Sequence, residues 1–187
     1  MGPRARRPLR RARRRRPAHP RRPEGGGVAQ SAVEHASRQR VAPIPAMLER
    51  GLAVGLGVDG AASNDTQDML ATLRIAAYLQ RAVHRRADLL GFPQMLDIAC
   101  GGANYALGLS PVTGGVTVGS PADLTLVRFD RDYATLPVRD PGASLLTTGS
   151  RSIVDTVMVG GEIVVEDERH TRIDEAEFTK QLAALSV

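Results

Sequence analysis

The sequence predicts an α/β fold followed by a small β element, and three observations carry that prediction. A short apolar run flanked by glycines, residues 52–58, precedes a long helical pattern, which is typical of a buried parallel strand followed by a helix. Two apolar runs separated by Gly160-Gly161 predict a β-hairpin. The composition changes after Gly114, which separates the two predicted regions.

Charge divides the chain a second time, near Val41. Residues 1–40 hold 13 Arg, no Lys and 2 Glu, a net charge of +11, whereas residues 41–187 hold 12 basic and 18 acidic residues, a net charge of −6. The net charge of +5 for the whole chain therefore hides an acidic folded part. We divide the chain into a leader over 1–40, a strand-and-helix region over 41–114, and a β element with a C-terminal helix over 115–187.

The leader is composed of Arg, Pro, Ala and Gly, which cannot bury enough apolar surface to offset its chain entropy, so it is predicted to be disordered. One interpretation is a basic arm that binds nucleic acid or an anionic membrane through phosphates. Its lack of Lys and of interleaved aromatic residues argues against this. An organelle transit peptide also fits the Arg content, but the prolines and the missing amphipathic pattern argue against it.

We favour a third interpretation, in which the leader is read out of frame. Arg, Pro, Ala and Gly are the residues encoded by codons of G and C alone. When residues 29–41 are read one base later, their codons admit the string HSPRSNMRLGSG, and the written frame then resumes at Val41. A single inserted or deleted base near codons 40–41 explains both the string in the shifted frame and the return to the written frame at Val41.

The folded part is predicted to begin with a helix and a strand. The helix ends over residues 46–50, with Gly51 as its stop. The apolar run 52–58 is short enough for a strand buried on both faces, and it ends at Asp59.

Two helices are predicted next. The first is capped by Asp65 or Thr66 and runs to about Arg86, because apolar residues recur along one face of it. Phe92-Pro93 opens the second, over residues 94–107. The apolar stripe of the first helix is Met69, Leu70, Leu73, Ala76, Ala77 and Val83.

The last third is predicted to be a β element closed by a helix. Residues 122–127 form a strand, and residues 153–159 and 162–166 form the two arms of the hairpin. Residues 174–185 form the final helix.

Several classes of site are excluded or disfavoured by composition. The single cysteine, Cys100, rules out an internal disulfide and a cysteine-based zinc site, and we expect it to be a small core residue in a reduced compartment. No apolar run reaches the roughly 18 residues of a membrane span, so we expect a cytoplasmic protein. His84 and His170 are expected at the surface, and the other two histidines, His19 and His35, lie in the leader.

Five segments, in this order, resemble one protein family. VGLGVDGAASND, residues 54–65, resembles the eighth barrel strand and following turn of the amidohydrolase superfamily, in the branch of guanine, 8-oxoguanine and adenosylhomocysteine deaminases and triazine hydrolases. The other four segments are similar to later elements of that branch. They are DMLATLRIAAYLQR (68–81), LDIACGGANYALGL (96–109), GSPADLTLV (119–127) and VDTVMVGGEIVVED (154–167).

The resemblance implies the C-terminal piece of a (β/α)8 metal-dependent hydrolase barrel with part of an accessory β domain. It implies that Asp59 is a metal ligand and a proton shuttle, at the strand end where such barrels place their active sites. The resemblance allows Ser63 and Asn64 to orient this loop or to touch substrate. We favour the alternative, in which both are ordinary turn and cap residues.

The expected function follows from the same resemblance. The intact relative is expected to use one Zn²⁺ or Fe²⁺ to hydrolyse a C–N bond, or to remove a related leaving group, on a purine, pyrimidine or triazine ring. Asp59 alone cannot hold that metal, because the other barrel ligands are absent, so we expect the chain to be inactive by itself. The expected partners are a small heterocyclic substrate and a second copy of the chain, not nucleic acid or membrane; the alternative is a basic-arm nucleic-acid-binding protein.

Overall fold

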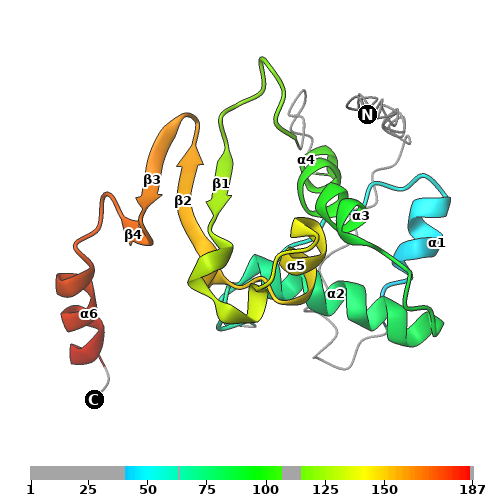
Figure 1. Ribbon diagram of the computed structural model, residues 1–187, viewed down its shortest axis with the longest axis horizontal. Coiled ribbons are helices and arrows are strands. Elements are labelled where there is room, and N and C mark those ends of the chain that lie inside the picture. The colour runs from blue at the N-terminus through cyan, green and yellow to red at the C-terminus, as the bar shows by residue number, and fades with distance from the viewer. Residues whose placement is uncertain (1–40, 63, 107–114, 186–187) are drawn as a thin grey trace, which may run out of the picture.

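The computed structural model describes residues 41–62, 64–106 and 115–185. It confirms a mixed α/β architecture: helices α1 to α5 gather on one side of a four-stranded sheet, and α6 lies beyond the opposite edge of that sheet (Figure 1). The proposed leader over 1–40 and Ser63 lie outside the described residues, so the expectations about them stay predictions.

The first helix forms as predicted, but the strand after it does not. Helix α1 spans Ile44–Glu49, and the chain turns at Gly51, where φ is +71°. The segment 52–58 contains only a single β-bridge, at Val54, and no ladder. A parallel strand needs neighbouring strands to accept and donate its backbone hydrogen bonds, and the described residues supply none. Of the predicted buried strand, only the burial of Val54 and Leu56 is observed.

Helix α2, Met69–His84, begins later than predicted. Its cap is Asp68, whose carboxylate accepts a hydrogen bond from the backbone N–H of Ala71, so the prediction of Asp65 or Thr66 was wrong. Gln67 has a φ of +47°, a left-handed conformation that cannot continue into the helix.

One residue of the predicted apolar stripe of α2 is misplaced. Leu73, Ala76 and Ala77 are buried as expected, but Val83 is 56% exposed. Gln80 is buried instead, and its side-chain amide donates to the carbonyl of Ala42. This hydrogen bond pairs the buried nitrogen of the amide, whereas its buried Oε1 has no hydrogen-bond partner among the described residues.

The second predicted helix is interrupted by a wider turn. It is divided into α3, Phe92–Asp97, a π-helical turn over Ile98–Gly102, and α4, Ala103–Ala106. Such π turns inside helices often mark functional sites.

The β element forms as predicted and gains one short strand. The strands are β1, Leu124–Val127, β2, Val154–Val159, β3, Glu162–Glu166, and β4, Arg169–His170, paired antiparallel in chain order. Gly160 and Gly161 form the hairpin turn with φ of +58° and +86°, as a two-residue turn between twisted strands requires.

The hydrophobic core lies among the helices. Helix α5, Pro141–Thr147, is capped by Asp140 and was not predicted, yet its Leu146 joins this core. Arg74 on α2 ties α5 in place by donating to the carbonyls of Thr147 and Gly149. The core residues are Ile44, Val54, Leu56, Leu73, Ala76, Ala77, Leu90, Met95, Ile98 and Leu146.

The final helix forms as predicted, but it makes little contact with the other described elements. Helix α6, Glu175–Ala184, is capped by Asp174 and has no buried residue. Its side chains Phe178 and Leu182 are about half exposed. No helix among the described residues is long and apolar enough to cross a membrane.

Candidate functional site

Asp59 stands at the start of an exposed loop that joins the buried segment 52–58 to α2. Its backbone has a φ of +67°, in the left-handed region that L residues other than Asn and Asp seldom adopt. Its carboxylate Oδ1 accepts a 2.7 Å hydrogen bond from the backbone N–H of Gly60. Within the described part of the chain, Oδ2 accepts no hydrogen bond, and Asp59 as a whole is exposed.

Asn64 closes the loop on itself. Its side-chain amide donates to the carbonyl of Val58 at 3.0 Å, and its backbone N–H donates to the carbonyl of Gly60 at 3.0 Å. Its own side-chain oxygen accepts from the Thr66 hydroxyl at 3.0 Å. These bonds hold the residues on both sides of Asp59, and the turn and cap role that we favoured for Asn64 stays a prediction. Ser63, the other candidate, lies outside the described residues.

Gln67 is a third loop residue that sequence patterns did not single out. Its side-chain Nε2 donates to the carbonyl of Asn64 at 2.6 Å and to that of Asp59 at 3.4 Å. No sequence pattern distinguishes an exposed Gln in the polar stretch Asp65-Thr66-Gln67-Asp68. Its position over the loop results from the turn of the backbone, which only the folded structure shows.

The segment that carries Asp59 is supported from behind by the π turn. A Cβ at Gly102 would lie 2.1 Å from the carbonyl oxygen of Val54, and a Cβ at Gly55 would lie 3.0 Å from the Cα of Ala103. The two backbones therefore touch, which only glycine allows at such a distance. This contact places the Val54–Leu56 segment, and so the start of the Asp59 loop, against a helix.

Cys100 lies in the same π turn and is half-buried, so the expectation of a core position is met only in part. Burial raises the pKa of its thiol above the ordinary value of 9.0, and the nearby Asp97 carboxylate raises it further. At neutral pH the group is therefore a thiol, the unreactive form.

A metal centre is not complete within the described residues. A catalytic zinc ion takes three protein ligands and keeps a fourth position for water or substrate. No group of three or more His, Cys, Asp or Glu side chains able to hold a metal occurs in the part of the chain that the structure describes. His84 and His170 are exposed, as expected. Asp59 by itself thus fits no more than one position of such a centre.

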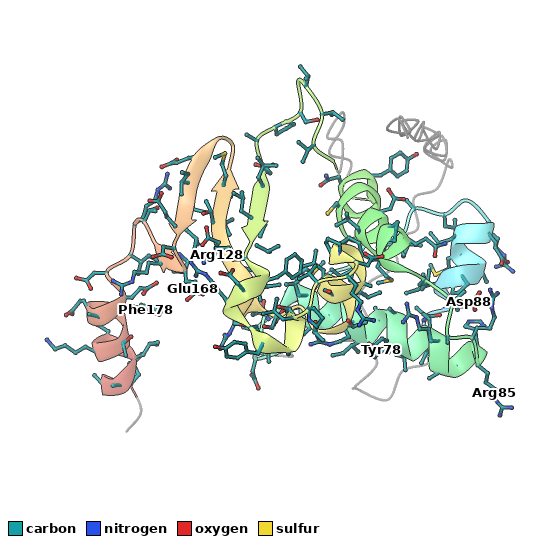
Figure 2. All side chains as sticks on the ribbon, in the orientation of Figure 1. Tyr78, Arg85, Asp88, Arg128, Glu168 and Phe178 are labelled. Atoms are coloured by element: carbon teal, nitrogen blue, oxygen red, sulfur yellow. The ribbon has the colours of Figure 1, made fainter. Side chains whose placement is uncertain are left out.

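A second cluster of charges lies on the sheet, apart from the Asp59 loop. The Arg131 guanidinium pairs with Asp155 at 2.6 Å, with Asp167 at 2.5 Å and with Glu168 at 2.5 Å. Figure 2 shows Glu168 on the sheet side of the molecule, toward β4 and α6, far from the Arg85 end of α2. This cluster joins the loop after β1 to β2 and to the β3–β4 turn, which is a structural role.

The chain matches one protein family over most of its length. The sequence profile of the amidohydrolase family matches residues 20–164. The match covers the Asp59 loop, the π turn and the hairpin.

Two curated relatives are deaminases of the same name. A 5-methylthioadenosine/S-adenosylhomocysteine deaminase of Acetivibrio thermocellus is 36% identical over 135 residues, which are 72% of this chain and 31% of the relative. The deaminase of that name from Desulforudis audaxviator is 36% identical over 160 residues, 84% of this chain and 36% of the relative. The chain thus spans about a third of the length of these relatives.

Two solved structures are similar in fold. A zinc-bound adenosine deaminase from Xanthomonas campestris superposes with a TM-score of 0.77 at 26% identity, over 84% of this chain and 36% of its own. The atrazine chlorohydrolase from Arthrobacter aurescens, also complexed with zinc, superposes with a TM-score of 0.75 at 31% identity, over 84% and 35%.

Proposed function

The chain belongs to the amidohydrolase family, and we propose that it is the closing part of the (β/α)8 barrel, with part of an accessory β domain, of an enzyme that hydrolyses a C–N bond on a purine, pyrimidine or triazine ring. We assign the barrel part to residues 41–114 and the accessory part to 115–187. The related deaminases and the chlorohydrolase support this substrate class.

One observation carries the proposal. In the segment matched by the family, Asp59 ends a buried apolar run and presents an open carboxylate oxygen, held at its other oxygen by Gly60. Active sites of such barrels lie at the carboxyl ends of the strands, where this residue would stand if neighbouring strands flanked segment 52–58.

Asp59 is proposed to contribute one ligand to a metal centre whose other ligands come from outside the described residues. Zinc is present in the related structures, and a bound metal of this kind lowers the pKa of water. The described residues do not form a complete metal centre, so the proposal for this chain concerns the Asp59 carboxylate. We propose that its Oδ2 accepts a proton from water and returns it to the leaving group.

A hybrid enzyme tests this assignment. Residues 41–187 replace the matching third of the Acetivibrio thermocellus deaminase, and the hybrid is assayed with zinc on 5-methylthioadenosine, S-adenosylhomocysteine and a triazine. Asp59→Asn should lower kcat/KM by about 10²- to 10⁴-fold, as expected for loss of a general base. Asp65→Asn, in the same loop, should stay within about twofold, as a surface change does.

Two results of the hybrid-enzyme assay would contradict the proposal. A folded hybrid that turns over none of these rings contradicts the assigned function, and full activity in Asp59→Asn contradicts the assigned residue. The 187-residue chain alone is expected to show no turnover; activity there would show that the centre is complete without further strands.

A further inference from the structure

Gln67 stands in the loop between Asp59 and α2 and has no part in the proton transfer proposed above. Its backbone adopts a φ of +47°, and Asp59 adopts +67°. A residue other than glycine is strained in the left-handed region and stays there only when its surroundings hold it. Neither residue is buried, so packing does not hold these conformations, and hydrogen bonds within the loop must do so.

The hydrogen bonds of Gln67 act on the peptide group between Asp59 and Gly60. Its Nε2 donates to the carbonyl of Asp59, and the N–H of the same planar peptide group belongs to Gly60. That N–H donates to Oδ1 of Asp59. The C=O and N–H bonds of this group lie in one plane and point in opposite directions, so holding the carbonyl also fixes the direction of the N–H toward the carboxylate.

The second bond of Gln67 anchors its own side chain. Nε2 lies 2.6 Å from the carbonyl of Asn64, which is the shorter and stronger of its two contacts. Asn64 is in turn fixed to Val58 and Gly60. The amide of Gln67 is thus held by a residue that is already tied to both sides of Asp59.

We infer that Gln67 is a positioning residue, which orients the Asp59 carboxylate through the Asp59–Gly60 peptide group and leaves Oδ2 free. The inference rests on the proposed function for the use made of that carboxylate. Its geometry is a property of the chain and does not depend on a metal or a substrate.

Amide hydrogen exchange by NMR on the full chain tests this inference. Gln67→Met keeps an unbranched side chain of the same length but removes the donor. The exchange rate of the Gly60 amide should rise by about twofold to tenfold, which corresponds to the loss of one net hydrogen bond. The ¹³C shift of the Asp59 carboxyl should move toward that of an unbonded carboxylate.

Two controls separate positioning from general stability. Thr66→Ala removes a different side-chain bond of the loop, from Thr66 to Asn64, and should leave the Gly60 amide unchanged. The buried Ala77 on α2 reports global opening, and its exchange should not change in either variant.

Three results would overturn the inference. They are an unchanged Gly60 rate in Gln67→Met, an equal change in Thr66→Ala, and an equal change at Ala77, which would mean that the whole fold had loosened. A failure of the proposed function would instead appear as a folded hybrid enzyme that turns over none of the rings, with Gly60 exchange still dependent on Gln67.

Discussion

The helical region and the sheet of this chain are held together by different forces. Helices α1 to α5 share a core in which side chains such as Met95 and Ala77 are completely buried. Strands β1 to β4 and helix α6 contain no buried residue. Backbone hydrogen bonds and the Arg131 cluster join the strands, and Glu175 of α6 accepts a hydrogen bond from the backbone N–H of His170 on β4. The difference shows that one half of the chain carries its own hydrophobic stabilisation, whereas the other half depends on polar contacts that solvent can replace.

Matched leucine truncations give the sharpest test of this contrast. Leu73→Ala on α2 should lower the free energy of unfolding by about 2–5 kcal/mol, because Leu73 is 5% exposed and its loss leaves a cavity. Leu126→Ala on β1 should change it by about 0.5 kcal/mol or less, because Leu126 is 49% exposed. Urea denaturation measures both. Equal losses would mean that the sheet has a core of its own.

Glycine substitutions test the contact between the π turn and segment 52–58. Gly102→Ala should lower the free energy of unfolding by about 1–3 kcal/mol, because its Cβ would collide with the carbonyl of Val54 and the backbones would have to separate. Gly57→Ala is the control, since nothing lies within 4 Å of the added Cβ. A neutral Gly102→Ala would contradict the close approach on which the placement of Asp59 depends.

Arginine substitutions test whether polar contacts hold the sheet. Arg131→Met leaves Asp155, Asp167 and Glu168 without their shared partner, so amide exchange in β2 and β3 should become faster. Arg128→Met breaks only an exposed pair with Asp130 and should change little. Exchange in α2 should be unaffected by either variant, and a change there would couple the two regions more strongly than their separate contacts indicate.

The smallest expected effect comes from pH. The pKa of the Cys100 thiol is raised in the folded chain by burial and then by Asp97, so the folded state keeps its proton at a pH where the unfolded state has lost it. The resulting stabilisation is complete below the ordinary value of 9.0 and is lost as pH rises from there through the folded pKa. Melting temperatures from pH 7 to pH 10, compared between the wild type and Cys100→Ser, measure it. Iodoacetamide should also react more slowly with the folded chain than with free cysteine, and equal rates would contradict the burial.

The sequence determined those elements whose causes are local. The apolar stripe over residues 69–77, the Phe92-Pro93 helix start and the Gly160-Gly161 turn each act within a few residues, and each predicted element is present. The resemblance to the amidohydrolases was likewise readable from the segments, and the family match confirmed it.

The tertiary structure decided the rest, because those features depend on partners distant in the chain or on the path of a turn. Segment 52–58 has a strand's composition, but the described residues give it no neighbouring strand, so Val54 and Leu56 are buried without a β-ladder. Helix α5 has no strong pattern of its own and is placed by Arg74 and the core around Leu146. Asp59 could be identified from the sequence. Its left-handed backbone and the position of the Gln67 amide over its peptide group appear only in the folded loop, because they depend on hydrogen bonds between residues up to eight positions apart.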